Sequence, residues 1–524
     1  PIENVDGVDE LVLTKLGAWR KQSLAAEALG KAKRIIWVSA LEQLQTVRGI
    51  ASDIGVNWLY TRNLKFNQRY LRRVEAVSPE QVQAVFDRYL TEDNLNAVSL
   101  RPSTLPRKTS RPTRAQKQNQ VRLLPNGVPV VLIPDDRLGV LHGSLVGAGG
   151  VLVDPPKRSG LNRLYTQCLL KGTTKRSAQE IADTIESLGG SLFGDSGYNS
   201  FRLGFSSLTE DFGLVVQLAT EILAIPAFPE DAIEREKASQ IAAIEADEAQ
   251  SAVIARNVLR SAIYGDHPYA ANPAGTKASV ANAQRTDLVQ LHEWLKTSSA
   301  WALGICGHFD EKKLWEELCE TIGSLPQRPA TYSFEMPPVR PFEAQTIVQR
   351  NEKHQAFVAV GYLACTLADP DRVGFEALDE GTGDASSRFF VKLREELGLA
   401  YSVGTSLALG LAPGIFNLYA ATAPETADEV AKLYHQEISA LAANGLSSEE
   451  LERSKNKLLA QFEFQKQNLE SYCHSLALNQ LYGFGLDYFD QRQRQIEGIK
   501  AQDIRGVCHK YLMDKPATTV IVKS

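Results

Sequence analysis

The stretch LREELGLAYSV, residues 393–403, places an arginine and a tyrosine on either side of a glycine. The run 387–396 favours a helix, and Gly398 suits the left-handed conformation that often follows a helix end. After this glycine, residues 400–405 predict a short strand. A helix-to-strand corner of this kind can aim the arginine and the tyrosine into one space.

Arg394 and Tyr401 suit a reaction in which a carbonyl oxygen gains negative charge. Arginine donates hydrogen bonds from a rigid fork, and a tyrosine hydroxyl can donate to an oxyanion. The spacing also fits an ordinary surface, with Arg394 as a solvated helix residue paired with a glutamate and Tyr401 packed on the core. Spacing alone favours this structural alternative, because surface ion pairs are common and weak.

Composition places the chain among soluble globular proteins. Its 524 residues are 44% hydrophobic and 23% charged, with a formal net charge of −5, which argues against a general nucleic-acid binder. No uninterrupted apolar run reaches transmembrane length. The six cysteines are scattered and include no C-x-x-C pair, so neither a zinc ribbon nor a dense disulfide framework is indicated.

Internal repeats predict the architecture. Residues 74–90 and 496–512 share most of their apolar positions, their first acid and a final Tyr-Leu pair, and a weaker third copy spans 280–294. Each copy predicts a turn, an amphipathic helix and then an apolar strand, the strands being expected at 97–100, 301–307 and 519–522. Upstream of the copies, long helical stretches are expected at 11–29, 233–264 and 451–481.

Strands are also expected ahead of these helices. Residues 120–133 surround an Asn-Gly turn and predict a hairpin, and residues 356–362 predict a buried strand. The fold class is therefore α+β. We expect five parts: the truncated end of a preceding unit at 1–102, a linker at 103–120, a unit at 121–325, a Pro-rich linker at 326–342 and a last unit at 343–524.

The run GTGDASSRFF at 381–390, followed by 393–403, resembles the C-terminal half of pitrilysin-type (M16, insulinase-like) zinc peptidases. In that family, this arginine and tyrosine bind substrate and stabilise the transition state from the half that does not hold the zinc. The resemblance implies that Arg394 and Tyr401 are catalytic residues. It also implies repeated units, each with a mostly antiparallel sheet packed with helices, that form part of a clam-shell around a peptide.

The zinc motif of that family, H-x-x-E-H on a helix, is absent. Its surroundings survive at 154–161 and 169–177, but Arg163, Thr166 and Gln167 occupy the positions of the two histidines and the glutamate. Glu245 lies near the expected position of the family's distant glutamate ligand, where a solvated acidic helix face is the simpler interpretation. No two of the eight histidines have i, i+3 or i, i+4 spacing.

The preferred interpretation is the non-zinc portion of an M16-type zinc endopeptidase. Zinc, general base and water would come from a partner chain or a cleaved N-terminal part in a heterodimer-like assembly, the substrate would be a peptide, and this chain alone would bind no zinc and be inactive. The alternative is a non-catalytic scaffold or peptide-capture subunit. Bacterial relatives are often periplasmic, so the resemblance slightly favours periplasm over cytoplasm.

Overall fold

The computed structural model describes residues 47–90, 119–136, 139–329, 335–351 and 355–524, together with scattered positions before residue 47. The chain divides into unit 1, Pro1–Ala115, and unit 2, Gln116–Ser524. The expected strand at 97–100 and most of the expected helix at 11–29 lie outside the described residues. No helix within the described part is long and apolar enough to cross a membrane.

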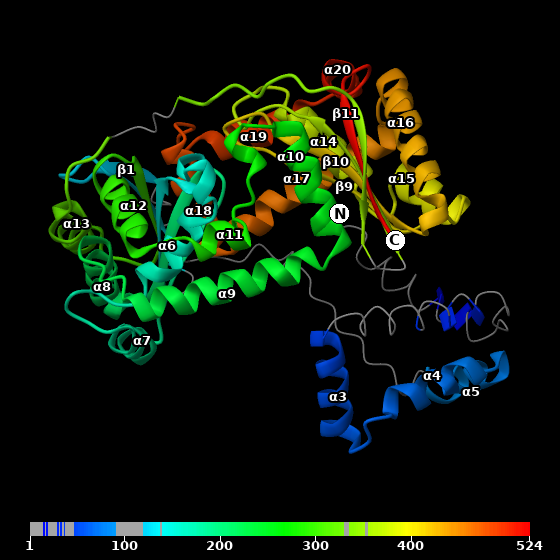
Figure 1. Ribbon diagram of the computed structural model, residues 1–524, viewed down its shortest axis with the longest axis horizontal. Coiled ribbons are helices and arrows are strands. Elements are labelled where there is room, and N and C mark those ends of the chain that lie inside the picture. Colours follow the sequence, from blue (N-terminus) through cyan, green and yellow to red (C-terminus); the bar gives the residue numbers. More distant parts are fainter. Residues whose placement is uncertain are drawn as a thin grey trace, which may run out of the picture. The chain divides into compact units, whose positions relative to one another are not determined.

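Unit 1 contains three helices in its described part: α3 (Val47–Thr61), α4 (Phe66–Ala76) and α5 (Pro79–Tyr89) (Figure 1). The sequence of α5 specifies its start, because Ser78 and Gln81 form a reciprocal capping box and Pro79 occupies the first turn. The turn and helix expected at 74–90 are therefore confirmed.

The first sheet of unit 2, sheet A, has the strand order β1-β2-β6-β3-β5-β4. The hairpin expected around the Asn-Gly turn is confirmed as β1 and β2, with Gly127 at φ +85°. Only β2 and β6 pair in parallel. The strands are β1 (Gln120–Leu123), β2 (Pro129–Pro134), β3 (Val140–Ala148), β4 (Ser191–Ser196), β5 (Ser200–Leu208) and β6 (Trp301–Gly307).

The second sheet, sheet D, has the order β7-β11-β8-β10-β9. Its single parallel pair is β7 with β11, so the order and directions of β2-β6-β3-β5-β4 recur strand for strand. The repeat seen in the sequence therefore corresponds to two sheets with the same strand order and directions. The strands are β7 (Gln345–Arg350), β8 (Ala356–Leu363), β9 (Ala400–Ala408), β10 (Ile415–Thr422) and β11 (Ala517–Lys523).

Unit 2 has a first half, residues 120–325, that contains sheet A, and a second half, residues 343–524, that contains sheet D. One face of each sheet is covered by helices of its own half. Sheet A buries Val130, Leu132 and Leu303 against its own helices, and sheet D buries Val358 and Val360 in the same way. The helices of the first half are α6 (Leu161–Leu169), α7 (Ala178–Ser187), α8 (Phe212–Ala224), α9 (Glu230–Glu248), α10 (Ser251–Tyr264), α11 (Lys277–Ala281), α12 (Arg285–Thr297) and α13 (Glu311–Glu320). Those of the second are α14 (Arg372–Thr382), α15 (Arg388–Phe390), α16 (Ala427–Asn444), α17 (Ser448–Gln467), α18 (Leu469–Leu481), α19 (Tyr488–Gly498) and α20 (Ala501–Tyr511).

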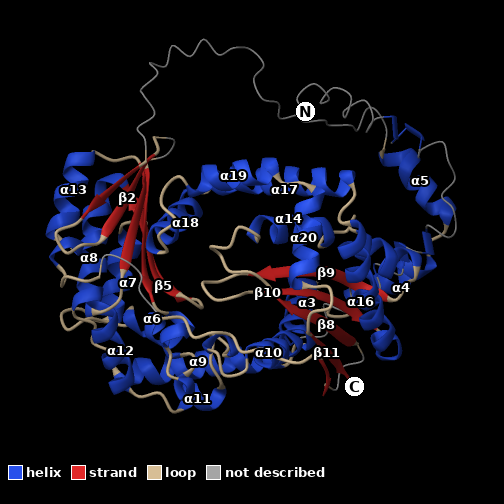
Figure 2. Ribbon diagram, turned by 90° about the horizontal axis from the view of Figure 1, so that it is seen from above, coloured by secondary structure: helices blue, strands red, loops and turns tan. Residues whose placement is uncertain are grey.

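The opposite face of each sheet is covered by a helix from the other half. The sequence predicts one continuous helix at 233–264 and another at 451–481, and both predictions are wrong. The first stretch breaks at residues 249–250 and the second breaks at Asn468. After the break, α10 packs on β8 and β11 of sheet D, and α18 packs on β3 and β6 of sheet A. Figure 2 shows α9–α10 and α17–α18 linking the two sheets.

Glycines in central strands allow this close approach. A Cβ at Gly304 of β6 would lie 2.7 Å from the Cys473 carbonyl oxygen of α18, and one at Gly361 of β8 would lie 2.7 Å from a methyl carbon of Leu259 of α10. Both helices therefore lie closer to the sheet than a side chain in the strand would allow. The α+β class with mostly antiparallel sheets is confirmed; the clam-shell and the five-part division remain predictions.

Candidate functional site

The corner predicted at residues 387–405 is present, with an unusual helix at its start. Ser387 caps α15 by accepting a hydrogen bond from the Phe390 amide at 3.3 Å. The helix then widens into a π-helical turn, Val391–Glu396, and the Leu397 amide donates to the Lys392 carbonyl five residues back at 3.1 Å. Arg394 lies in this turn; such turns are rare and often mark functional sites.

Tyr401 lies in a β-bulge at the start of β9. In the pairing with β10, Thr422 is opposite Ala400 and Ala421 is opposite Ser402, so Tyr401 is the extra residue. Bulges re-aim a side chain and are over-represented at strand edges and next to active sites. The Tyr401 side chain is 52% exposed on an edge strand of sheet D.

The two predicted site residues are brought together. Nη1 of Arg394 donates a hydrogen bond of 2.7 Å to the backbone carbonyl of Tyr401, and the guanidinium lies 4.9 Å from the centre of the Phe390 ring. The expected left-handed glycine is confirmed, with Gly398 at φ +63°. The Thr422 hydroxyl bonds to the Leu399 carbonyl and holds the loop between them. These bonds hold the Arg394 guanidinium against the backbone at Tyr401, while the Tyr401 side chain stays exposed.

Ion pairs fix the corner to neighbouring helices. Arg388 Nε donates to Glu450 at 2.9 Å at the start of α17, and Lys392 pairs with Glu437 of α16. Phe389 and Leu393 are fully buried beneath the turn. This half-buried scaffold was not predicted from the sequence, because its partners lie 45 to 62 residues away along the chain.

Two carboxyl groups near the corner are shifted in opposite directions. Burial raises the pKa of Asp379 on α14 to about 6. Partial burial also acts on Asp384, but hydrogen bonds from Lys457 and Ser386 outweigh it and hold the pKa of Asp384 below its usual range. Asp384 therefore stays charged and anchors the segment that precedes Ser387.

The helix α6, where the resemblance places the zinc motif, carries structural hydrogen bonds at these positions. Thr166 is fully buried and its hydroxyl donates to the Arg163 carbonyl at 2.9 Å, while Gln167 Nε2 donates to the Gly194 carbonyl of β4 at 2.9 Å. Glu245 is exposed and near Lys277. Arginine, threonine and glutamine do not supply the ligands that zinc prefers, so these residues do not fit the family's metal. No cluster of three or more His, Cys, Asp or Glu that could hold a metal occurs among the described residues.

A half-buried aspartate, Asp154, fixes the start of that helix. Asp154 accepts hydrogen bonds from the Gly160 and Asn162 amides at 2.9 and 3.0 Å. Burial raises the pKa of Asp154 to about 6, although these bonds oppose the shift. The acid therefore serves the helix N-terminus, which favours a negative charge.

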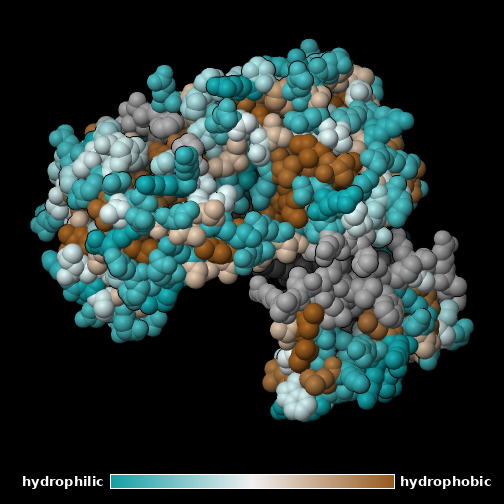
Figure 3. All heavy atoms as spheres, viewed as in Figure 1, coloured by the Kyte–Doolittle hydropathy of each residue, from teal (hydrophilic) through white to brown (hydrophobic). Residues whose placement is uncertain are grey.

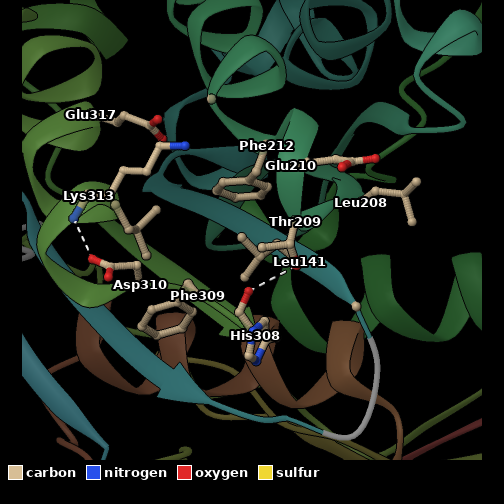
Figure 4. A pocket seen from close by; sticks show the side chains of 13 residues that line it. Leu141, Leu208, Thr209, Glu210, Phe212, His308, Phe309, Asp310, Lys313 and Glu317 are labelled. Carbon is tan, nitrogen blue, oxygen red and sulfur yellow. Dashed lines mark hydrogen bonds between the residues drawn. The ribbon is translucent and has the colours of Figure 1, made fainter.

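A pocket of about 460 Å³ opens beside sheet A, near the start of β3 and the ends of β5 and β6 (Figure 4). Two of its polar groups serve local structure: Asp310 caps α13 by accepting from the Lys313 amide at 2.9 Å, and Thr209 donates to the His308 carbonyl at 3.0 Å. Arg394 and Tyr401 do not line it. The His308 ring lies 2.7 Å from Asp136, and the Thr209 hydroxyl bonds to the His308 backbone, so the corner remains the better candidate.

Known proteins show the same architecture. The family described as Insulinase (Peptidase family M16) matches residues 143–277, and that described as Peptidase M16 inactive domain matches residues 282–458. The chain belongs to the M16 peptidase family. Similar proteins include the "Uncharacterized zinc protease YmxG" of Bacillus subtilis, 21% identical over 403 residues, covering 76% of this chain and 97% of the relative. Another is the "Uncharacterized zinc protease Rv2782c" of Mycobacterium tuberculosis, 24% identical over 426 residues, with 80% and 96% coverage.

Solved structures agree on the fold. An M16 inactive domain from Pseudomonas fluorescens has a TM-score of 0.71 at 20% identity and covers 78% of this chain and 98% of that one. A protease from Helicobacter pylori has a TM-score of 0.68 at 19% identity, with 78% and 99% coverage. The M16 relatives are thus matched over nearly their whole length by about three quarters of this chain.

Proposed function

We propose that this chain is the non-zinc portion of an M16-type zinc endopeptidase and that Arg394 and Tyr401 act on the scissile peptide. The observation that carries the proposal is the joint distortion of the backbone at both residues. Arg394 lies in a π-helical turn and Tyr401 in a β-bulge, and a 2.7 Å hydrogen bond links them. Backbone distortions of this kind are retained mainly where a side chain must be aimed.

The chemistry follows from the two side chains. The Tyr401 hydroxyl can donate a hydrogen bond to a carbonyl oxygen as it becomes an oxyanion, and the guanidinium supplies positive charge beside it. Because one nitrogen of Arg394 is held by the Tyr401 carbonyl, the other nitrogens can donate to substrate backbone in a fixed direction. An extended peptide would bind by adding a strand to a sheet edge, and β9 is an edge strand of sheet D.

Zinc, when present in the assembly, would activate the attacking water. Because Arg163, Thr166 and Gln167 do not fit the metal, we propose that a partner part carrying H-x-x-E-H binds it. That part could be a separate chain or a cleaved N-terminal fragment. The structural use of Thr166 and Gln167 also suits a scaffold or peptide-capture subunit, in which Arg394 and Tyr401 would have no catalytic role.

The test is native mass spectrometry with peptide mapping of the protein purified from its source without chelator, followed by a peptidase assay. The proposal expects a co-purifying part that carries H-x-x-E-H and zinc, and hydrolysis only when both parts are present. A zinc-free species of this chain alone, or hydrolysis by the partner at the same rate without this chain, would instead establish the scaffold.

A further inference from the structure

Helix α3 in unit 1 is the sequence counterpart of α18 in unit 2. The repeat between 74–90 and 496–512 has a constant offset, and the same offset carries 47–61 onto 469–483 without a gap. Asn57, Leu59 and Tyr60 then coincide with an asparagine, a leucine and a tyrosine of the second segment. Both segments are helical. The repeat thus extends beyond the 17 residues that first reveal it.

The counterpart helix α18 uses one of its faces to pack against sheet A. Cys473 and Ala477 of α18 lie over Gly304 of β6, with the Cys473 Sγ 2.9 Å and the Ala477 Cβ 3.3 Å from where a Cβ would be. Leu481 is buried with Val146, Ala300 and Ala302 of sheet A. Tyr482 donates to the Ser200 hydroxyl of β5 at 3.2 Å. The face of α18 therefore binds a sheet that its own half of the chain does not supply.

The corresponding face of α3 is apolar and exposed. Ala51 and Gly55 stand in place of the two small residues over the glycine, and both are exposed. Val56, Leu59 and Tyr60 correspond to Leu478, Leu481 and Tyr482 and are 50%, 63% and 79% exposed. Figure 3 shows hydrophobic side chains at the surface over α3. An apolar helix face of this size normally packs against a partner.

The two described sheets are already covered on both faces. Sheet A lies between its own helices and α18, and sheet D lies between its own helices and α10. A second copy of the chain presents the same covered sheets. Neither the described sheets nor those of a second copy therefore offer a free face of the type that α10 and α18 bind.

We infer that α3 docks across the open face of the β-sheet of a further M16-type unit, in the way that α18 lies across sheet A. The small residues Ala51 and Gly55 contact a central strand of that sheet at a glycine, and Leu59 fills the apolar surface beside it. The identification of that unit with the zinc-bearing part rests on the proposed function; the docking itself does not.

Gly55 offers a matched set of variants, because nothing lies within 4 Å of a Cβ built on it. Gly55→Ala reproduces the alanine of α18 and should retain docking. Gly55→Arg places a long charged side chain between the helix and the sheet and should abolish docking, with helical content measured by circular dichroism unchanged. Gly506→Arg on α20, also at an open glycine, controls for the added charge.

The experiment places the photo-reactive residue p-benzoylphenylalanine at Leu59 of the full chain in its source cells. Cross-linked peptides are then mapped by mass spectrometry. The inference expects a cross-link to a strand of an M16-type unit outside residues 119–524, kept in Gly55→Ala and Gly506→Arg and reduced at least tenfold in Gly55→Arg.

Cross-links to another class of protein, to residues 119–524 of either copy, to helices alone or to nothing would overturn the inference, as would an unchanged yield in Gly55→Arg. The failure of the proposed function is distinguishable. If α3 cross-links to the sheet of an M16-type unit that lacks H-x-x-E-H, the docking is supported, but its identification with the zinc-bearing part is wrong. If a zinc-bearing partner co-purifies but α3 does not cross-link to its sheet, the proposed function is supported and the docking of α3 is refuted.

Discussion

Arg394 donates a 2.7 Å hydrogen bond from Nη1 to the backbone carbonyl of Tyr401, seven residues later and across the left-handed Gly398. The bond joins a π-helical turn to a β-bulge. The bond ties the Arg394 guanidinium to the Tyr401 backbone, while both side chains are exposed. The two residues should behave as one unit in kinetics.

Replacing the guanidinium tests this coupling. Arg394→Lys keeps the charge but loses the planar fork, so one ammonium cannot hold the Tyr401 carbonyl and substrate in the same geometry. We expect kcat/KM of the complete assembly to fall by about tenfold or more. The double variant with Tyr401→Phe should lose less than the product of the two single losses, as steady-state kinetics on a peptide would measure. Fully multiplicative losses would mean that the residues act independently.

The glycines beneath the crossing helices should resist substitution. At Gly304, an added Cβ meets the Cys473 carbonyl at 2.7 Å, a backbone atom that cannot rotate away. Gly304→Ala should therefore lower the free energy of unfolding by about 1–3 kcal/mol. Gly506→Ala, in a helix with open space around it, should be neutral or stabilising by up to about 1 kcal/mol. Urea unfolding of the full chain measures both, and equal effects would contradict the close packing of α18.

Acid should weaken the packing of α18 on sheet A. His474 lies near Ser144, with Nδ1 and Oγ 3.1 Å apart, and burial together with the Arg202 charge lowers the pKa of His474 to about 3. Its unfolded pKa is about 6.5, so the unfolded state binds the extra proton between these values. The stabilisation is present above pH 6.5 and is lost as the pH falls toward 3, with a slope of about 1.4 kcal/mol per pH unit.

His474→Gln is the matched variant for this slope. It retains a polar side chain beside Ser144 but does not titrate, so its unfolding free energy should fall less steeply between pH 6 and 4. Urea unfolding at a series of pH values measures the difference. Parallel slopes for the two proteins would show that His474 is protonated in the folded state.

Metal removal should leave the isolated chain unaffected. The resemblance places Arg163 and Gln167 where the two zinc-binding histidines would be and Thr166 where the general base would be. Thr166 and Gln167 instead donate structural hydrogen bonds. A chelator should therefore leave the melting temperature of the full chain unchanged, while it abolishes peptide hydrolysis by the complete assembly. A fall in the melting temperature of the chain alone would indicate a metal bound by its own residues.

The sequence predicts the corner well because its signals are local. Gly398 readily adopts the left-handed conformation that ends a helix. The residues after it favour a strand, so β9 and the position of Tyr401 follow. The π-helical turn and the bulge do not follow, since they depend on pairing with β10 and on the distant partner Glu450. The break before α18 has a local signal, the capping residue Asn468. The direction that α18 takes after the break has no local signal, because the sheet on which it packs, sheet A, is built from residues 120–307.

The most direct measurement is the turnover of the complete assembly carrying Tyr401→Phe, with Tyr419→Phe on the neighbouring strand as control. Tyr401 is half-exposed, so losing its hydroxyl should change the unfolding free energy by no more than about 0.5 kcal/mol. Losing an oxyanion donor should lower kcat by about 100-fold or more, whereas Tyr419→Phe should stay near the parent rate. Turnover near the parent rate in Tyr401→Phe would contradict the role assigned to this chain.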